Sequence, residues 1–192
     1  MDHVLRIATR QSPLAMWQAN FVKASLELCW PELKVRLIPM STSGDRFLSD
    51  TLAALGGKGM FVKELERALL EGEADLAVHS LKDVPAHLPE GLCLSTFLAR
   101  ESPEDAFISQ AASIRALAPG AVIGTASLRR QALVKHYYPH LEVNVLRGNV
   151  NSRLAKLDEG AFDAIILAHA GLKRLEKTAC IAEILPIAQF IP

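Results

Sequence analysis

The sequence predicts an α/β protein built from two similar lobes, each with a mostly parallel sheet and flanking helices. Three observations support this fold class. Short apolar runs typical of strands alternate with longer segments in which apolar residues recur at helical spacing. A pattern near the N-terminus recurs in the second half of the chain, and a charged stretch containing Pro103 lies between the halves. Alternating strands and helices form parallel sheets through right-handed crossovers, so we expect one lobe over residues 1–99 and another over 100–192.

The first lobe opens with an expected strand over residues 4–8, which ends in a polar tip at Arg10. Ser12 then caps a helix, because a serine side chain can accept a bond from the free N–H groups of the first turn. The apolar residues of this helix lie close to helical spacing and predict a buried face, with Trp17 in the core. These residues are Leu14, Trp17, Phe21 and Leu28. A second strand is expected over 34–40.

A glycine-rich segment, Gly-Gly-Lys-Gly-Met-Phe at residues 56–61, precedes a helix that is expected to end near Gly72. The segment is no nucleotide phosphate loop, because Leu52 and Gly59 stand where that motif needs a glycine and a Ser or Thr. Glycines around a polar loop give hinge freedom, so the segment could be a lid that carries Lys58. A plain surface loop is the alternative.

A short buried strand is expected over residues 75–78, and polar residues follow it at once. Lys82 and Asp83 stand at this tip, before Pro85 closes the segment. The carboxyl ends of strands in open α/β sheets are where ligands bind, so these two side chains are candidates for a site. A solvated turn is the plainer interpretation. A further strand is predicted over 93–98.

The second lobe repeats the first. Ile7 to Ser12 and the helix after it correspond to Ile123 to Ser127 and its helix, and Pro-Glu-Leu-Lys-Val corresponds to Pro-His-Leu-Glu-Val. The expected elements are a strand over 121–125, a helix over 128–138 capped by Ser127, a strand over 142–146, a polar tip over 147–151, a helix over 152–159 and a strand over 163–167. A cleft between two such lobes is the expected site.

Positively charged side chains recur where strands end and helices begin. They are Arg10, Lys82, Arg129, Arg130, Arg147 and Arg153. Arg129 and Arg130 lie in the first turn of the expected helix, where a positive charge opposes the helix dipole. This lowers stability by a few tenths of a kcal/mol unless an anion is present. With the hydroxyl groups of Ser12, Thr125 and Ser127, these ends predict a receptor for a ligand with several carboxylates or phosphates. Each Arg taken singly could equally be a surface residue.

Asp83 is the one acidic residue among the candidate site residues. Asp83 could stabilise a developing positive charge or shuttle a proton. His79 and His169, which correspond in the repeat, are expected to be buried and hydrogen-bonded and not catalytic.

Composition excludes several classes of function. The 192 residues carry 21 Lys plus Arg and 21 Asp plus Glu, so no general field draws the protein to nucleic acid or a membrane surface. No apolar run approaches the roughly 20 residues of a membrane span and no leader is evident, so we expect a soluble, cytoplasmic protein. The cysteines, Cys29, Cys93 and Cys180, are far apart and are expected to be small buried residues without disulfides or metal.

Several segments together resemble the porphobilinogen deaminase, or hydroxymethylbilane synthase, family over essentially the whole chain. They are LRIATRQSPLA from Leu5, then GGKGMFVKELE, DLAVHSLKDVP, GTASLRRQ, LRGNVNSRLAKLD and DAIILAHAGLKRL. The resemblance implies two lobes similar to type II periplasmic binding proteins. It also implies a cytoplasmic, monomeric transferase of heme and tetrapyrrole biosynthesis, which joins four porphobilinogen units with loss of ammonia onto a covalent dipyrromethane primer.

The resemblance assigns roles to residues of this sequence. Asp83 would hold the pyrrole nitrogens and stabilise cationic intermediates, while the six cations named above would bind acetate and propionate groups. Ser12, Thr125 and Ser127 would add hydrogen bonds, and Lys58 would belong to a lid. The family's motifs also include Gln18, Ser80 and Gly148 among the expected binding residues.

The family has a cofactor-attachment cysteine and a completed first lobe, and this chain is expected to lack both. In the family the primer is attached to a cysteine of a third domain, and none of the three cysteines here has that context, so we expect no covalent dipyrromethane and no sustained turnover by these 192 residues alone. The first lobe is expected to be incomplete, because family members finish it with returning chain. Ser102 and Glu104 depart from the usual residues of the crossover. The alternative function is a two-lobed receptor or effector module that binds an anion without catalysis.

Overall fold

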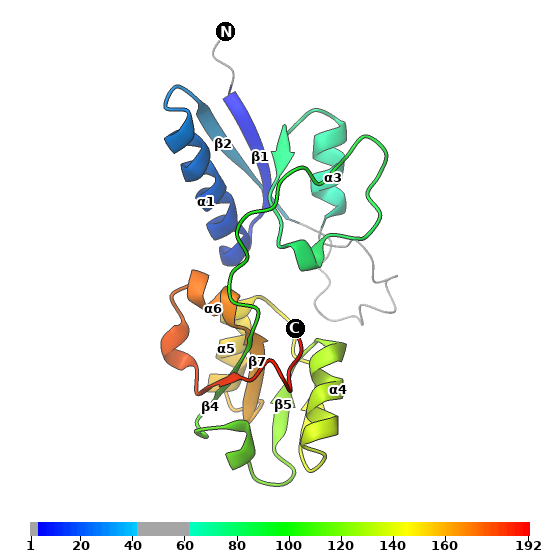
Figure 1. Ribbon diagram of the computed structural model, residues 1–192, viewed down its shortest axis with the longest axis vertical. Coiled ribbons are helices and arrows are strands. Elements are labelled where there is room, and N and C mark those ends of the chain that lie inside the picture. The colour runs from blue at the N-terminus through cyan, green and yellow to red at the C-terminus, as the bar shows by residue number, and fades with distance from the viewer. Residues whose placement is uncertain (1–3, 42–61) are drawn as a thin grey trace. The chain divides into compact units, whose positions relative to one another are not determined.

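The computed structural model describes residues 4–41 and 62–192, and the chain divides into two compact units with the boundary between Phe97 and Leu98 (Figure 1). Each unit is an α/β structure with its own sheet. The glycine-rich segment with Lys58 lies outside the described residues. No helix among the described residues combines the length and the apolar character that a bilayer span requires.

The sheet of the first unit has three parallel strands in the order β2-β1-β3. The strands are β1 (Val4–Arg10), β2 (Lys34–Met40) and β3 (Leu76–Ala77). Ile7 of β1 pairs with Leu37 on one side and with Leu76 on the other. The predicted first and second strands are therefore confirmed, whereas the third is shorter than expected and only half-buried.

Helices α1 (Pro13–Cys29) and α3 (Lys63–Leu70) cover opposite faces of this sheet. Successive residues of a strand point to opposite faces, and Ile7 and Ala8 show this directly. Ile7 packs with Ala19 of α1, whereas Ala8 packs with Leu65 of α3. All four side chains are fully buried, so the end of β1 is held from both sides.

The predicted core face of α1 is wrong. Ala15 and Ala19 are its buried residues, because their small side chains let the helix lie close against the sheet. Trp17 is 38% exposed and stacks on Phe21, with ring centroids 5.5 Å apart, while Leu28 is 82% exposed. The large apolar residues thus form a neighbouring, exposed stripe of the helix.

The strand predicted over residues 93–98 is absent. This segment is exposed along its whole length and has no assigned strand pairing. An apolar run becomes a strand only when a neighbour accepts its backbone hydrogen bonds, and the three-stranded sheet offers this segment none. Its apolar residues Leu94 and Phe97 are consequently 45% and 65% exposed.

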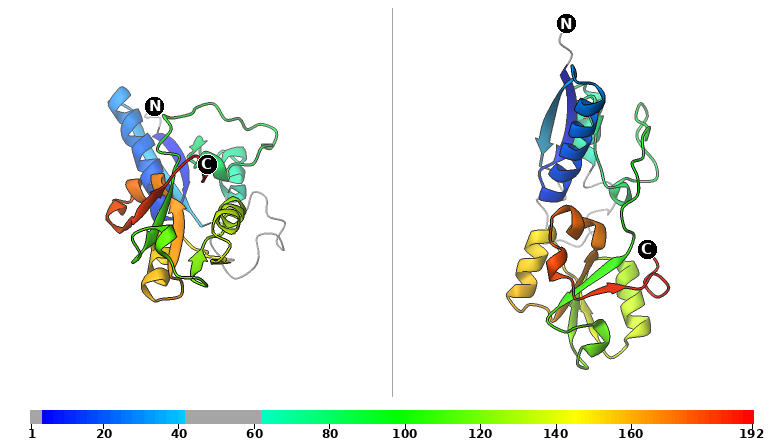
Figure 2. Two further views of the ribbon diagram at one scale, coloured as in Figure 1. Left: turned by 60° about the horizontal axis from the view of Figure 1, so that its bottom comes forward. Right: turned by 60° about the vertical axis from the view of Figure 1, so that its left-hand side comes forward.

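The second unit has a five-stranded mixed sheet in the order β6-β5-β7-β4-β8 (Figure 2). Its strands are β4 (Asp105–Ser109), β5 (Val122–Gly124), β6 (Glu142–Asn144), β7 (Ala164–Ala168) and β8 (Glu183–Leu185). Strand β5 pairs in parallel with β6 and β7, whereas β4 pairs antiparallel with β7 and β8. The parallel part was predicted, and the antiparallel strands β4 and β8 were missed.

The internal repeat is visible in the strand order. Strands β2-β1-β3 of the first unit and β6-β5-β7 of the second have the same order and the same parallel pairing. The helices that follow the central strands, α1 and α4 (Leu128–Tyr137), are both capped by a serine, Ser12 and Ser127. In each unit, therefore, the helix begins at the carboxyl end of the central strand.

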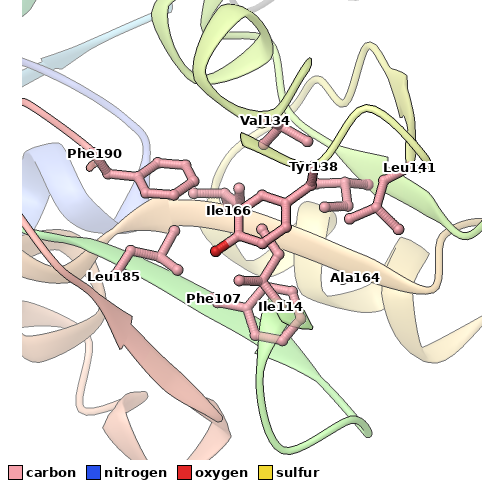
Figure 3. Packing of buried hydrophobic residues seen from close by; sticks show 10 residues of the cluster. Phe107, Ile114, Val134, Tyr138, Leu141, Ala164, Ile166, Leu185 and Phe190 are labelled. Atoms are coloured by element: carbon pink, nitrogen blue, oxygen red, sulfur yellow. The ribbon is translucent and has the colours of Figure 1, made fainter. Parts of the chain in front are cut away.

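The core of the second unit lies on both faces of its sheet. Phe107, Ile166 and Phe190 are fully buried on the face that α4 covers, together with Val134 of α4 (Figure 3). The other face is covered by α5 (Val150–Asp158) and α6 (His169–Arg174), and fully buried Leu172 packs there. Each such side chain contributes about 1.5 to 3 kcal/mol on burial, so this sheet is a firm base for the loops at its edge.

Candidate functional site

A hollow in the first unit gathers residues from the carboxyl ends of β1 and β3 and from the first turns of α1. Five of the expected site residues line it: Arg10, Ser12, Gln18, Ser80 and Asp83. Leu14, Ala15, Val78 and His79 complete its wall. The two strands are parallel neighbours, so their polar tips meet at one edge of the sheet, as the sequence predicts.

Hydrogen bonds within the first unit fix the wall of this hollow. Ser12 caps α1 and accepts a bond from the Ala15 N–H at 3.4 Å. The Gln18 amide donates to the Ser80 hydroxyl at 3.0 Å, which ties α1 to the segment after β3. Buried Thr9 donates to the Ala15 carbonyl at 3.2 Å, so the start of α1 is also anchored to the end of β1.

Asp83 closes a short 3-10 helix, Leu81–Asp83; it is exposed and forms part of the wall of the hollow. The Asp83 N–H donates to the Ser80 carbonyl at 2.9 Å, which holds the turn in place. Lys82 lies on the same turn and is exposed, but it is not part of the wall of the hollow.

His79 stands in the hollow with Asp83 and Arg10. Burial lowers the pKa of the His79 imidazole; the Asp83 carboxylate opposes this effect and the Arg10 guanidinium adds to it. The imidazole is therefore neutral near pH 7. Sequence reasoning treated His79 as a structural residue; its position directly after the strand, beside the two charged candidates, was the signal that it belongs to the hollow.

The second unit carries a polar group at the end of β5 and the start of α4. Ser127 caps α4 and accepts a bond from the Arg130 N–H at 3.5 Å, while the Ser127 N–H donates to buried Thr125 at 3.3 Å. Gln131 donates to the Thr125 carbonyl at 3.1 Å, a contact that sequence reasoning missed. These bonds fix the helix N-terminus, where partial positive charge favours anions.

Arg129 and Arg130 share an internal counter-charge, Asp105. One Nη atom of each guanidinium lies 2.7 Å from a different oxygen of this carboxylate, which is 2% exposed. The sequence predicted that this arginine pair would need an anion, and the protein itself supplies one. Asp105 ends the charged stretch around Pro103 and precedes the apolar run Ala-Phe-Ile, which indicates a strand start but not a partner for the arginines.

A second polar group follows β6, the parallel neighbour of β5. Asn149 caps α5 and accepts a bond from the Ser152 N–H at 3.0 Å. The Arg153 Nε donates to the Gly148 carbonyl at 2.7 Å, and Arg147 precedes this glycine. Because β5 and β6 run in parallel, both polar groups of the second unit lie at the same edge of its sheet.

Other expected residues lie apart from these groups. His169 is half-buried, and its Nδ1 lies 2.8 Å from the Ser102 hydroxyl, so it is hydrogen-bonded as expected. The expectation that all cysteines are buried is wrong, because Cys29, the last residue of α1, and Cys93 are exposed. Within the described ranges, His, Cys, Asp and Glu side chains form no group of three or more that would hold a metal ion.

A sequence profile described as porphobilinogen deaminase, dipyromethane cofactor binding domain, matches residues 5–192. The chain is 55% identical over 190 residues to a porphobilinogen deaminase of Legionella pneumophila strain Lens and 54% identical to that of strain Philadelphia 1. Each match covers 98% of this chain and 62% of the relative, so the chain spans less than two thirds of the length of these relatives.

Solved structures of binding proteins share the fold. The methionine-binding protein MetQ aligns with a TM-score of 0.55 and 12% identity over 95% of this chain and 78% of its own. A nutrient-binding protein from Burkholderia cenocepacia bound to methionine aligns with a TM-score of 0.52 and 13% identity over 97% and 81% of the two chains. Both likenesses extend to the fold alone.

Proposed function

The chain belongs to the porphobilinogen deaminase family, and from this premise we propose that the complete protein is a hydroxymethylbilane synthase. It joins four porphobilinogen units head to tail into a linear tetrapyrrole. In each condensation the aminomethyl C–N bond breaks and ammonia leaves, a C–C bond forms to the free α-carbon of a pyrrole, and that carbon loses its proton. The observation that carries the proposal is the hollow in which Asp83 stands with Arg10 at the carboxyl ends of two parallel strands.

Asp83 has the chemistry that this reaction needs. Loss of ammonia from an electron-rich pyrrole leaves positive charge on the ring, and a fixed carboxylate stabilises such a charge. The same carboxylate can accept hydrogen bonds from pyrrole N–H groups. Arg10 in the same hollow supplies a guanidinium for a substrate carboxylate, and the Ser12 and Ser80 hydroxyls add neutral hydrogen-bonding groups.

The second unit offers the groups that a dipyrromethane cofactor requires. Such a cofactor carries acetate and propionate side chains, and its free pyrrole α-carbon is the position onto which substrate units are joined. The guanidinium groups of Arg129, Arg147 and Arg153 and the capped N-terminus of α4 suit carboxylates of this kind. Buried Arg130 also has an Nε atom without a hydrogen-bond partner among the described residues, which suits a further acceptor.

The proposal is tested by Asp83→Asn in the complete gene product. We expect the variant to fold normally and to lose at least about a hundredfold in kcat, because the amide keeps the shape of the side chain and removes its charge. Asp158→Asn, at the exposed end of α5, is the matched control and should turn over like the wild type. Porphobilinogen consumption and tetrapyrrole absorbance measure turnover, and circular dichroism measures folding. Wild-type turnover by a folded Asp83→Asn variant would refute the role of Asp83.

The second candidate function is a module that closes on an anionic metabolite without reacting with it. The fold, which two methionine-binding proteins share, is compatible with it. The two candidates differ in a single experiment: porphobilinogen is mixed with the complete protein, and ammonia release and intact mass are followed. The synthase releases ammonia and gains mass in pyrrole steps, whereas the binding module does neither.

Several finer expectations stay predictions: a monomer, a cytoplasmic location, a covalent dipyrromethane on a cysteine outside these residues, and no turnover by the 192 residues alone.

A further inference from the structure

Asp105 links strand β4 to helix α4, which follows β5, and β4 and β5 are not neighbours in the sheet. It is the first residue of β4, while Arg129 and Arg130 belong to the first turn of α4, which follows β5. Strand β7 lies between β4 and β5, so the carboxylate reaches the arginines across the edge of the sheet. Its two oxygens are divided evenly, with 2.7 Å to Arg129 on one and 2.7 Å to Arg130 on the other.

The two guanidinium groups differ in what else they bind. The Arg130 side chain is 9% exposed, and its Nη1 donates to the Ile166 carbonyl of β7 at 3.2 Å. The Arg129 side chain is 35% exposed, and its Nη1 donates to the Ile191 carbonyl at 2.6 Å. Arg130 is thus held inside the unit, whereas Arg129 keeps a solvent-facing part of its guanidinium.

One carboxylate compensates only one of these two positive charges. The arginine pair with Asp105 therefore keeps a net positive charge, and it stands at a helix N-terminus that adds partial positive charge. Without the carboxylate, two like charges would meet at this place, one of them buried. Burying an uncompensated charge is costly, so the guanidinium groups would move apart or toward solvent.

We propose that Asp105 is a positioning residue, which orients Arg129 and Arg130 so that their remaining positive charge receives a carboxylate of the pyrrole ligand. The inference rests on the proposed function and adds a residue that acts through the arginines without touching the ligand. A purely structural ion pair would have a different signature, because its loss would lower stability and leave ligand affinity unchanged.

The test uses Asp105→Asn in the complete gene product, with kcat and KM for porphobilinogen and the porphobilinogen dissociation constant of the cofactor-free protein as readouts. We expect KM and the dissociation constant to rise about tenfold or more, because charge-assisted bonds to both arginines are lost, while kcat changes by less than about threefold. Asp105→Glu keeps the charge and should recover most of the affinity. Asp163→Asn is the control, since Asp163 accepts a bond from the Val122 N–H at 2.7 Å in the same unit.

The outcomes separate the inference from the function on which it rests. A folded Asp105→Asn variant with wild-type KM and dissociation constant overturns the inference, as does a loss of affinity that Asp163→Asn reproduces at equal loss of stability. If Asp105→Asn does not fold, the double variant Asp105→Asn/Arg130→Met removes the buried charge as well, and it should fold and still bind porphobilinogen weakly. A wild type that binds porphobilinogen without turnover contradicts the synthase alone; one that does neither contradicts both.

Discussion

Gln18 and Ser80 are 62 positions apart in the chain, and the Gln18 Nε2 donates to the Ser80 Oγ at 3.0 Å. The bond closes the wall of the hollow between α1 and the segment after β3, close to Asp83. Strand β3 pairs with β1 at Leu76 and Ala77, and the Val78 N–H donates to the Ala8 carbonyl at 3.2 Å, so the turn that carries Asp83 begins just beyond the backbone ladder. The side-chain bond therefore contributes to the position of Asp83.

Removal of this bond gives the first prediction. Ser80→Ala should lower the free energy of unfolding by about 1 kcal/mol, the usual net value of one side-chain hydrogen bond. It should also raise KM for porphobilinogen in the complete protein, because the turn that carries Asp83 loses an anchor and the hollow loses the Ser80 hydroxyl. Chemical denaturation and steady-state kinetics measure the two effects.

The matched control is Ser25→Ala on α1. The Ser25 hydroxyl donates to the Phe21 carbonyl at 2.8 Å, a bond within the helix that Ala does not need. We expect unchanged or slightly higher stability, since Ala is the best helix former. Equal losses in both variants would mean that the contact between Gln18 and Ser80 contributes nothing specific.

The pH dependence of stability gives the second prediction, through His79. Its folded-state pKa lies below the ordinary value of 6.5, so the unfolded chain binds the proton more readily than the folded one. The stabilising contribution is complete above about pH 6.5 and is lost as the pH falls through the lowered folded pKa. Denaturation of the 192-residue chain at a series of pH values measures this loss.

His79→Gln should flatten that part of the pH profile, because Gln does not titrate in this range. His87→Gln, at an exposed position of the same unit, should leave the profile unchanged. A profile that keeps its acid limb in His79→Gln would assign the effect to other groups.

Much of the fold could be predicted because its signals are local. The cap at Ser12 is set by the first turn of α1 and the strand over 34–40 by its own apolar run, while the repeat is visible as similar segments in the two halves. The buried face of α1 was missed, because alanine carries little apolar surface and Trp17 a great deal, although close packing favours the small residue. Strand β4 was missed because its pairing with β7 is antiparallel and distant in sequence.

The candidate site divides in the same way. Arg10, Ser12 and Asp83 could be predicted together, because polar residues at the ends of neighbouring parallel strands meet at one edge. Asp105 could not, since pairing between residues 24 and 25 positions apart depends on how β4 joins the sheet. A sequence shows which charges need a partner, but not whether the partner comes from the protein or from a ligand.

The third prediction concerns Arg147, which follows β6 at the edge that also carries Ser127. Arg147→Ala in the complete protein should impair capture of the cofactor or elongation, because one cation for a carboxylate is lost. Intact mass spectrometry of the purified enzyme should show less cofactor-loaded protein or accumulation at an earlier pyrrole adduct. Arg67→Ala, which removes an exposed ion pair with Glu71 on α3, is the control and should show the wild-type pattern of masses.

The fourth prediction concerns Gly148, which has a φ of 117°, a conformation that residues with a side chain rarely adopt. A Cβ atom there would lie 2.2 Å from the Ser152 Oγ, so an added methyl group must also displace this hydroxyl. Gly148→Ala should therefore cost more than the roughly 1 to 3 kcal/mol of backbone strain alone. Because the Gly148 carbonyl accepts the bond from Arg153, the substitution should also weaken ligand binding in the complete protein.

Gly160→Ala separates these effects. Gly160 has a φ of 76° and no atom within 4 Å of an added Cβ, so this variant reports backbone strain without a steric contact. The difference in unfolding free energy between the two variants measures the close approach to Ser152 together with the greater backbone strain of a side chain at a φ of 117°. If both variants lose the same stability, the contact with Ser152 is relieved at no cost, because the serine hydroxyl can rotate away. If Gly148→Ala alone also weakens binding, the Gly148 carbonyl positions Arg153 for the ligand.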